Sequence, residues 1–133
     1  MTKVVHVAVG IILRQQQVLL ALRPDKLHQG GRWEFPGGKV EAGETTAQAL
    51  ARELAEEVAL TVHSSTPWFE LTYDYPEKTV RLDIHLVQDF SGEAQGLEGQ
   101  PVRWVPLSEL GQYQFPDANQ PILDKLLAEF GRL

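Results

Sequence analysis

Hydrophobic and polar positions alternate most clearly in two stretches of the second half of this chain. From residue 80 to residue 86 every second position is apolar, namely Val80, Leu82, Ile84 and Leu86, and a period of two is typical of a half-buried β-strand. Residues 61–75 form a similar β-rich run, and Pro76–Glu77 separates the two runs as a turn. We therefore predict two long strands joined by a tight connection.

Shorter apolar runs predict further strands. Near the N-terminus, "VVHVAVGIIL" and "QVLLALR" flank "RQQQ", an arrangement typical of a hairpin or of adjacent strands. The segment "WEFPGGKVEAGE" predicts a short strand and a turn, "VRWVPL" predicts another short strand, and "SELGQYQFPDANQ" predicts irregular structure.

Two stretches have helical spacing instead. The first runs from Thr45 to about Val58, begins with the Thr45–Gln48 spacing of a capping box, and is expected to bury Ala47, Leu50, Leu54 and Val58. The second, "PILDKLLAEF", carries Pro121 in its first turn. Strands combined with two helices predict a single mixed α/β domain over residues 1–133, with the β-sheet between helices.

Composition narrows the class of protein. The 133 residues are 43% hydrophobic and 23% charged, as in one globular domain, and they include no cysteine, which rules out disulfides, thiol catalysis and thiolate metal sites. The net charge is −6 and no basic stripe is visible, so we expect no polymeric nucleic acid partner. No apolar run reaches bilayer-spanning length and the N-terminal run is typical of a strand, so we expect a soluble cytoplasmic protein without a membrane partner.

The first helix carries three crowded carboxylates. Glu53, Glu56 and Glu57 share one face beside the apolar stripe, where their mutual repulsion is stronger than on an open surface. A hard cation bound by oxygen ligands, Mg²⁺ or Mn²⁺, relieves that repulsion. Taken alone, three glutamates are more often a solvated helix face.

The residues before this helix favour the metal site. "FPGGKVEAGE" supplies a glycine turn, a lysine and a further carboxylate, Glu44. The whole stretch "GKVEAGETTAQALARELAEEVAL", residues 38–60, resembles the Nudix box at fixed spacing. The one departure is Ala59, where that family has the glycine that turns the chain out of the helix, and a left-handed alanine costs about 1 kcal/mol.

Further segments extend the likeness along essentially the whole chain. "HVAVGII", "EFPGGK", "EGQP" and "FPDAN" are similar to the MutT branch of the family, the 8-oxo-dGTP diphosphatases. The resemblance implies a Nudix-type α/β/α sandwich that uses Mg²⁺, with Mn²⁺ as a substitute. The implied reaction is hydrolysis of a nucleoside triphosphate to the monophosphate and pyrophosphate, by a protein we expect to be monomeric.

The resemblance also assigns roles to residues. It implies metal ligation by the Gly37 carbonyl and by four carboxylates, Glu53, Glu56, Glu57 and Glu98. Arg52 is expected to orient a box glutamate through a bidentate pair, and Glu44 is included in the catalytic set. Either Glu53 or Glu98 is the general base, and an ordinary loop acid is the alternative for Glu98.

Substrate binding is implied for a second group of residues. It comprises Arg23, His28, Glu34, Phe35, Pro36, Gly37, Gly38, Lys39, Tyr75 and Asn119. Asn119 is expected to pair its amide with O6 and N7–H of 8-oxoguanine, whereas ordinary guanine presents a bare N7 acceptor. The alternative is that Asn119 only caps the last helix. Arg23 and Lys39 are expected to bind phosphate, although both residue types are also common at strand ends.

The remaining histidines and the tryptophans are interpreted as structural. His6, His63 and His85 have no partner signal, and the three tryptophans favour packing over ligand contact. Two other functions stay open: a Nudix hydrolase for another nucleoside triphosphate, such as a pyrimidine one, and a non-catalytic nucleotide sensor.

Overall fold

The computed structural model describes residues 3–23 and 31–131. Its strands and helices follow the sequence pattern closely. The strands are β1 (Lys3–Arg14), β2 (Gln17–Leu22), β3 (Trp33–Glu34), β4 (Gly37–Lys39), β5 (Thr61–Tyr75), β6 (Lys78–Ser91) and β7 (Val102–Pro106). The α-helices are α1 (Thr46–Val58) and α2 (Gln120–Phe130), and two short 3₁₀ helices are η1 (Leu107–Gln112) and η2 (Asp117–Asn119).

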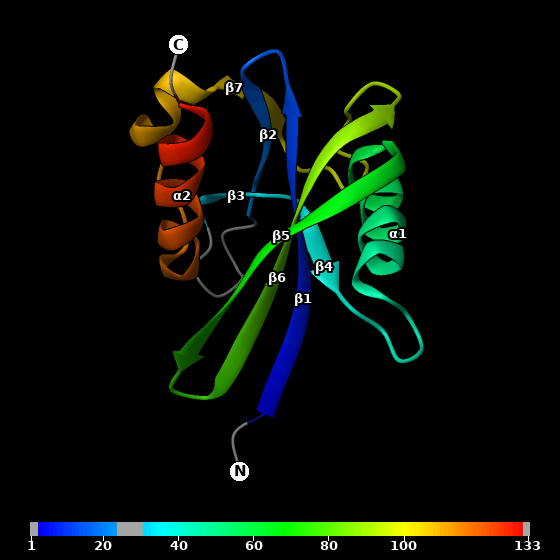
Figure 1. The fold of residues 1–133 in the computed structure, drawn as a ribbon, viewed down its shortest axis with the longest axis vertical. Helices are drawn as coiled ribbons and strands as arrows, with labels where there is room; N and C mark the ends of the chain where they lie inside the picture. The colour runs from blue at the N-terminus through cyan, green and yellow to red at the C-terminus, as the bar shows by residue number, and fades with distance from the viewer. Residues whose placement is uncertain (1–2, 24–30, 132–133) are drawn as a thin grey trace.

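The strands form one mixed sheet between the two α-helices. Its order is β3-β2-β1-β6-β5, with β4 also pairing to β1 and β7 to β2. In Figure 1, α1 covers one face of the sheet and α2 covers the other. The predicted α/β/α sandwich is therefore confirmed, including the hairpin of β1 with β2 and that of β5 with β6.

One pairing of the sheet joins distant parts of the sequence. Strands β1 and β6 run parallel, from Lys3 opposite Lys78 to Ile12 opposite Val87. Strand β4 lies antiparallel on the other side of β1, with Gly37 opposite Val9. The centre of β1 thus lies between β6 and the glycine segment, which places these three strands around one region of the sheet.

Helix α1 begins as predicted. The Thr45 hydroxyl accepts from the Gln48 backbone N–H and the Gln48 side chain accepts from the Thr45 N–H, so the capping box is complete. This arrangement satisfies two of the free N–H groups at the helix start.

The orientation of α1 about its axis differs from the prediction. Ala47 is exposed, so its assignment to the buried stripe is wrong, whereas Ala49 is fully buried. At about 100° per residue, Ala49 lies about 40° to one side of Glu53 and Leu50 about 60° to the other. Glu53 and Glu57 therefore lie on the half-buried side of α1, whereas Glu56 is exposed.

Two apolar clusters fill the layers on either side of the sheet. One joins the sheet to α1 through Leu50, Leu54 and Val58, and the other joins it to α2 through Ile122 and Leu126. Trp33, Trp68 and Trp104 pack at the edges of these clusters, as predicted.

The three histidines within the described residues make polar contacts, and none of them lines the pocket described below. His6 and His85 lie 3.3 and 3.8 Å from Asp83, and His63 lies 3.0 Å from the Ser91 hydroxyl. Burial lowers the pKa of His85, and the nearby Asp83 opposes that shift. These contacts support the structural interpretation of the histidines.

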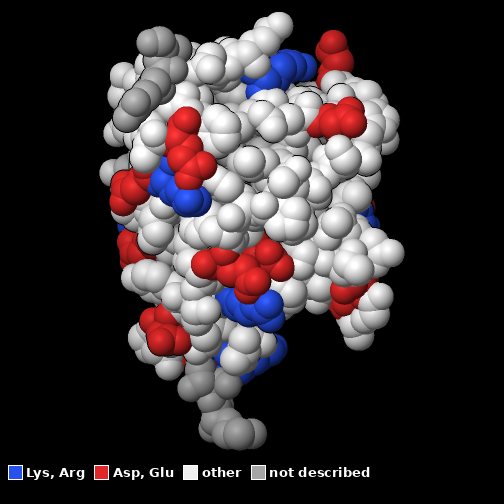
Figure 2. Space-filling model, viewed as in Figure 1, with Lys and Arg blue, Asp and Glu red and all other residues white. Residues whose placement is uncertain are grey.

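The surface mixes both signs of charge on the face that is visible. Figure 2 shows Lys and Arg beside Asp and Glu, with no continuous basic stripe on that face. Within residues 3–23 and 31–131, no helix is long and apolar enough to cross a membrane.

Candidate active site

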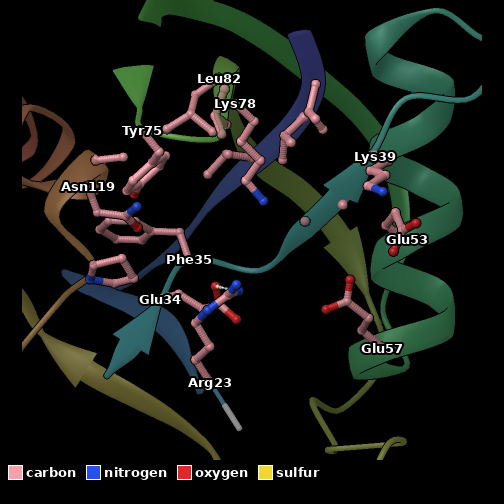
Figure 3. A pocket seen from close by; sticks show the side chains of 18 of the residues that line it. Arg23, Glu34, Phe35, Lys39, Glu53, Glu57, Tyr75, Lys78, Leu82 and Asn119 are labelled. Atoms are coloured by element: carbon pink, nitrogen blue, oxygen red, sulfur yellow. Dashed lines mark hydrogen bonds and ion pairs between the residues drawn. The ribbon is translucent and has the colours of Figure 1, made fainter. Parts of the chain in front are cut away.

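A pocket of about 420 Å³ opens between the glycine segment, α1, the start of β6 and η2. Figure 3 shows its two ends, with Asn119, Tyr75 and Phe35 at one and Glu53 and Glu57 of α1 at the other. The lining residues are Val5, Val7, Val9, Arg23, Glu34, Phe35, Gly37, Gly38, Lys39, Glu53, Glu57, Tyr75, Lys78, Val80, Leu82, Glu98, Pro116, Ala118 and Asn119. Most of the predicted site residues therefore come together in one cavity.

The acidic end draws carboxylates from separate parts of the chain. Glu53 and Glu57 project from successive turns of α1, and Glu98 reaches the pocket from the loop before β7. Glu56 does not line the pocket, and its side chain is 58% exposed. Within the described part of the chain, no group of three or more His, Cys, Asp or Glu side chains is arranged to hold a metal ion.

Arg52 fixes two acids behind the pocket. Its Nε and Nη2 donate to the two carboxylate oxygens of Glu44 at 2.8 and 2.9 Å, and its Nη1 donates to Glu53 Oε1 at 2.9 Å. The bidentate pair thus goes to Glu44, and Glu53 receives a single bond. The hydrogen bonds from Arg52, and after them the bond from the Glu41 backbone N–H, lower the pKa of Glu44 to about 2. Neither Arg52 nor Glu44 lines the pocket; Arg52 joins Glu44 to Glu53, which does.

Glu57 lies in an unfavourable environment for a charged carboxylate. Burial raises its pKa to about 9, and its hydrogen bond to Glu53 and the charges of Glu53, Glu98 and Glu34 act in the same direction. In the protein alone, burial and the neighbouring acids therefore favour the neutral form of Glu57.

Two glycines allow the backbone to approach this acid pair. A Cβ on Gly38 would lie 2.3 Å from the carboxyl carbon of Glu53, and a Cβ on Gly37 would lie 2.0 Å from the Ala8 carbonyl oxygen. Any side chain at either position would displace Glu53 or the β1–β4 pairing. Glycine is therefore required at both positions by close approach rather than by an unusual φ angle.

The opposite end of the pocket carries aromatic and amide groups. Phe35 stacks on Phe115, and burial raises the pKa of Tyr75. Asn119 is the residue before α2, yet its side chain makes no capping hydrogen bond. The alternative that Asn119 only caps the helix is therefore wrong, and its amide faces the cavity (Figure 3).

Cationic side chains lie between the two ends. Arg23 Nη1 lies 3.2 Å from Glu34 Oε1, and burial raises the pKa of Glu34 although Arg23 opposes the shift. Lys39 and Lys78 also line the cavity, and among residues 3–23 and 31–131 neither forms an ion pair with an acidic side chain. The Lys78 side chain points toward the centre of the pocket (Figure 3).

Two of the predicted substrate-binding residues cannot be placed in the lining. Pro36 is buried outside it, where its carbonyl accepts from the Gly10 N–H at 2.8 Å. His28 lies outside the described residues.

Sequence reasoning missed the wall of the pocket and Lys78. The wall comes from alternate residues of β1 and β6, such as Val5 beside Val80 and Val7 beside Leu82. The alternation of Val80 and Leu82 was visible, but alternation alone does not tell a face turned to the core from one turned to a cavity. The parallel pairing of β1 with β6 brings these residues together, and no local sequence pattern predicts that pairing.

The sequence matches the NUDIX domain over residues 8–125, which is most of its length. The chain belongs to the NUDIX family. It is 40% identical to the 8-oxo-dGTP diphosphatase of Escherichia coli K12, over 93% of this chain and 97% of that protein. It is also 36% identical to the CTP pyrophosphohydrolase of the same organism, over 95% and 93% of the two chains.

A solved structure gives the same result for the fold. In a study of MutT from Aliivibrio salmonicida and Vibrio cholerae, the matching chain superimposes with a TM-score of 0.84 at 41% identity, covering 96% of this chain and all of that one. The NUDIX assignment therefore rests on sequence and on fold together.

The departure from the NUDIX box at Ala59 leaves the helix exit intact. Ala59 adopts the left-handed conformation, with φ 64° and ψ 28°, and its N–H bonds to the Leu54 carbonyl. Ala59 thus takes the conformation that glycine adopts without strain at this position. The cost of that conformation is about 1 kcal/mol.

Proposed function

We propose that this NUDIX protein hydrolyses nucleoside triphosphates to the monophosphate and pyrophosphate, with 8-oxo-dGTP as its preferred substrate and Mg²⁺ as its cofactor. In that role it removes oxidised dGTP from the nucleotide pool. The names of the similar proteins support this activity, and the two-ended pocket supports it independently. We further infer a monomeric cytoplasmic enzyme without a polymeric nucleic acid partner.

The observation that carries the proposal is the position of Asn119. Its side chain is not used to cap α2 and faces the cavity instead, at the end opposite the acids of α1. A carboxamide offers one donor group and one acceptor on the same edge. The O6 acceptor and N7–H donor of 8-oxoguanine match that edge, whereas the bare N7 of guanine opposes the amide oxygen.

The acids at the other end fit a hard divalent cation. Glu57 is held in a site that disfavours its charge, because it is buried and lies near other acids, and a bound cation would offset that repulsion. Glu53, Glu57 and Glu98 are not arranged around one ion in the structure, but all three line this end, and with the Gly37 carbonyl they would supply only oxygen ligands, which Mg²⁺ prefers. We keep Glu56 in the proposed set, although its exposed side chain lies outside the lining and must turn inward to contribute.

A divalent cation held by these residues would supply neutralisation of phosphate charge and a lower pKa for the attacking water. The protein's own side chains bind the phosphates, orient the acids and accept the proton. Lys39 and Arg23 bind phosphate oxygens from the cavity wall, and Arg52 holds the carboxylate of Glu53 in one orientation. Glu53 or Glu98 accepts the proton of the water, since both carboxylates line the same end of the cavity.

One specific observation favours a second candidate. The chain shares 36% identity with a CTP pyrophosphohydrolase over nearly its full length. A pyrimidine triphosphate would use the same acids and cations, so only the base end distinguishes the two substrates.

The test is a panel of 8-oxo-dGTP, dGTP, CTP and dCTP with Mg²⁺, scored by pyrophosphate release. We expect kcat/KM for 8-oxo-dGTP to exceed that for dGTP by far more than tenfold. Asn119→Ala should reduce this preference by about 10- to 100-fold, because a bidentate amide pair contributes about 1–3 kcal/mol, and should retain metal-dependent hydrolysis.

The neighbouring Gln120→Ala is the matched control, because Gln120 is exposed and its amide bonds to Asp124 within α2. An unchanged preference in Asn119→Ala would remove the basis for naming the base. A preference of tenfold or less in the parent protein, or a higher kcat/KM for CTP, would favour the second candidate. If the Glu57→Gln variant does not turn over substrate but keeps the full function of the parent protein, the protein is a nucleotide sensor and not an enzyme.

A further inference from the structure

The loop that carries Glu98 is joined to the last turn of α1 by one glutamine side chain. Gln100 Nε2 donates to the Glu57 carbonyl oxygen at 3.0 Å, and Gln100 Oε1 accepts from the Glu98 backbone N–H at 2.9 Å. Leu97 N–H also donates to the Glu57 carbonyl, at 2.9 Å. Both lone pairs of that carbonyl are thus used by this loop.

Little else among the described residues fixes Glu98. Glu98 is exposed as a residue, its neighbour Leu97 is 51% exposed, and Gly99 follows with φ 83°. The turn itself closes through a Gly99 N–H bond to the Gly96 carbonyl at 3.1 Å. A turn of this kind defines its own shape but not its position relative to α1, which depends on the contacts to the Glu57 carbonyl and, before the turn, on the Gln95 N–H bond to the Val58 carbonyl.

The position of Gln100 is also constrained by its surroundings. A Cβ on Gly96 would lie 1.8 Å from the Gln100 backbone oxygen, so the loop folds tightly onto this residue only because position 96 is glycine. Gln100 itself is half-buried. Its amide uses a donor and an acceptor at once, which no carboxylate or apolar side chain of similar length can do.

We propose that Gln100 is a positioning residue that sets Glu98 relative to Glu57, and so assembles the acidic end of the pocket from two distant segments. The inference rests on the proposed function. Glu57 presents its carboxylate to the cavity and its backbone carbonyl to Gln100, so the same residue anchors the loop and contributes to the site. Loss of the amide leaves Glu98 on a loop held only by backbone contacts.

The first test uses metal-free protein and does not depend on activity. Backbone amide hydrogen exchange at Glu98 is compared in the parent protein and in Gln100→Met, which keeps the length but loses both bonds. We expect exchange at Glu98 to accelerate at least tenfold. The Gln95 amide, which bonds to the Val58 carbonyl at 3.0 Å, serves as the internal control and should change little.

The second test is a double-mutant cycle measured with 8-oxo-dGTP and Mg²⁺. We expect Gln100→Met to lower kcat by about 10- to 100-fold with KM within about twofold, since small misplacements of a catalytic group have effects of this size. In a Glu98→Gln background the same substitution should change kcat less than about threefold, because residues that act through one another are not additive. Gln88→Met, on the exposed face of β6, is the matched control.

Gln100→Leu repeats both tests if thermal melting shows that the methionine variant is not folded. Unchanged exchange at Glu98 would overturn the inference, and so would an undiminished effect of Gln100→Met in the Glu98→Gln background. Failure of the parent protein to release pyrophosphate from any triphosphate would refute the proposed function instead, and the exchange data would still decide the role of Gln100.

Discussion

Replacing Glu57 by glutamine perturbs the electrostatics of the acidic end without changing its shape. Glu57 has a pKa raised from the ordinary 4.5 to about 9 by burial and by neighbouring acids. A carboxyl whose pKa is raised on folding reduces stability wherever the unfolded chain is ionised and the folded chain is not. The metal-free protein should therefore be less stable at neutral pH because of this group.

The expected size follows from the pKa difference. Between pH 4.5 and pH 7 the cost grows by 1.36 kcal/mol per pH unit, reaching about 3 kcal/mol at pH 7. Glutamine avoids that cost but still buries a polar amide, so we expect Glu57→Gln to stabilise the metal-free protein by about 1–3 kcal/mol. For a chain of this size that corresponds to about 3–15 °C in Tm.

The assay is urea unfolding in EDTA from pH 5 to pH 8. The stability difference between Glu57→Gln and the parent should be below about 1 kcal/mol at pH 5 and grow steadily with pH. Glu56→Gln is the control, since that side chain is 58% exposed and surface substitutions usually change stability by less than about 0.5 kcal/mol. Added Mg²⁺ should stabilise the parent more than Glu57→Gln, because a ligand stabilises the state that binds it.

A Glu57→Gln protein no more stable than the parent at pH 7, or a difference that does not depend on pH, would refute this account of the acid cluster. Turnover gives a separate readout. The same variant should lose nearly all hydrolysis, so stability and activity should change in opposite directions, a pattern expected when an active site is strained for function.

Three further predictions concern the surroundings of the acids. Glu44→Gln should destabilise the protein at pH 7, and the difference should shrink as pH falls from about 4.5 toward 2, because the pKa of Glu44 is lowered to about 2 by Arg52; a difference independent of pH in urea unfolding would contradict this. Ala59→Gly should raise stability by about 0.5–1 kcal/mol in thermal melts, since it removes a left-handed alanine, and a loss of stability would refute the strain. EDTA should abolish pyrophosphate release and excess Mg²⁺ should restore it, whereas turnover indifferent to the chelator would exclude the proposed metal site.

Local signals in the sequence predicted the elements well. The capping box at Thr45 and the proline in the first turn of α2 depend on neighbours a few residues away, so the sequence alone reveals them. The orientation of α1 was predicted less well, because Ala47 and Ala49 are equally apolar and only the sheet decides which of them is buried.

The residues of the candidate site also divide into those with a local sequence signal and those that depend on distant pairing. The box acids were found because their spacing lies within one helix, and Asn119 was ambiguous because its local sequence suits a helix cap equally well. Lys78 and the valine wall of β1 depend on strand pairing across the whole chain. A single sequence does not show which distant strands pair, so these residues were missed.

The parallel ladder of β1 and β6 also bears on how the protein is made. It joins positions about 75 residues apart, as in Lys3 with Lys78, and such non-local pairing is slow because a long loop must close before any contact forms. During synthesis the acids of α1 leave the ribosome before β6 is complete. We therefore expect the cavity to assemble late in folding, because its β1–β6 wall cannot form until β6 pairs with β1.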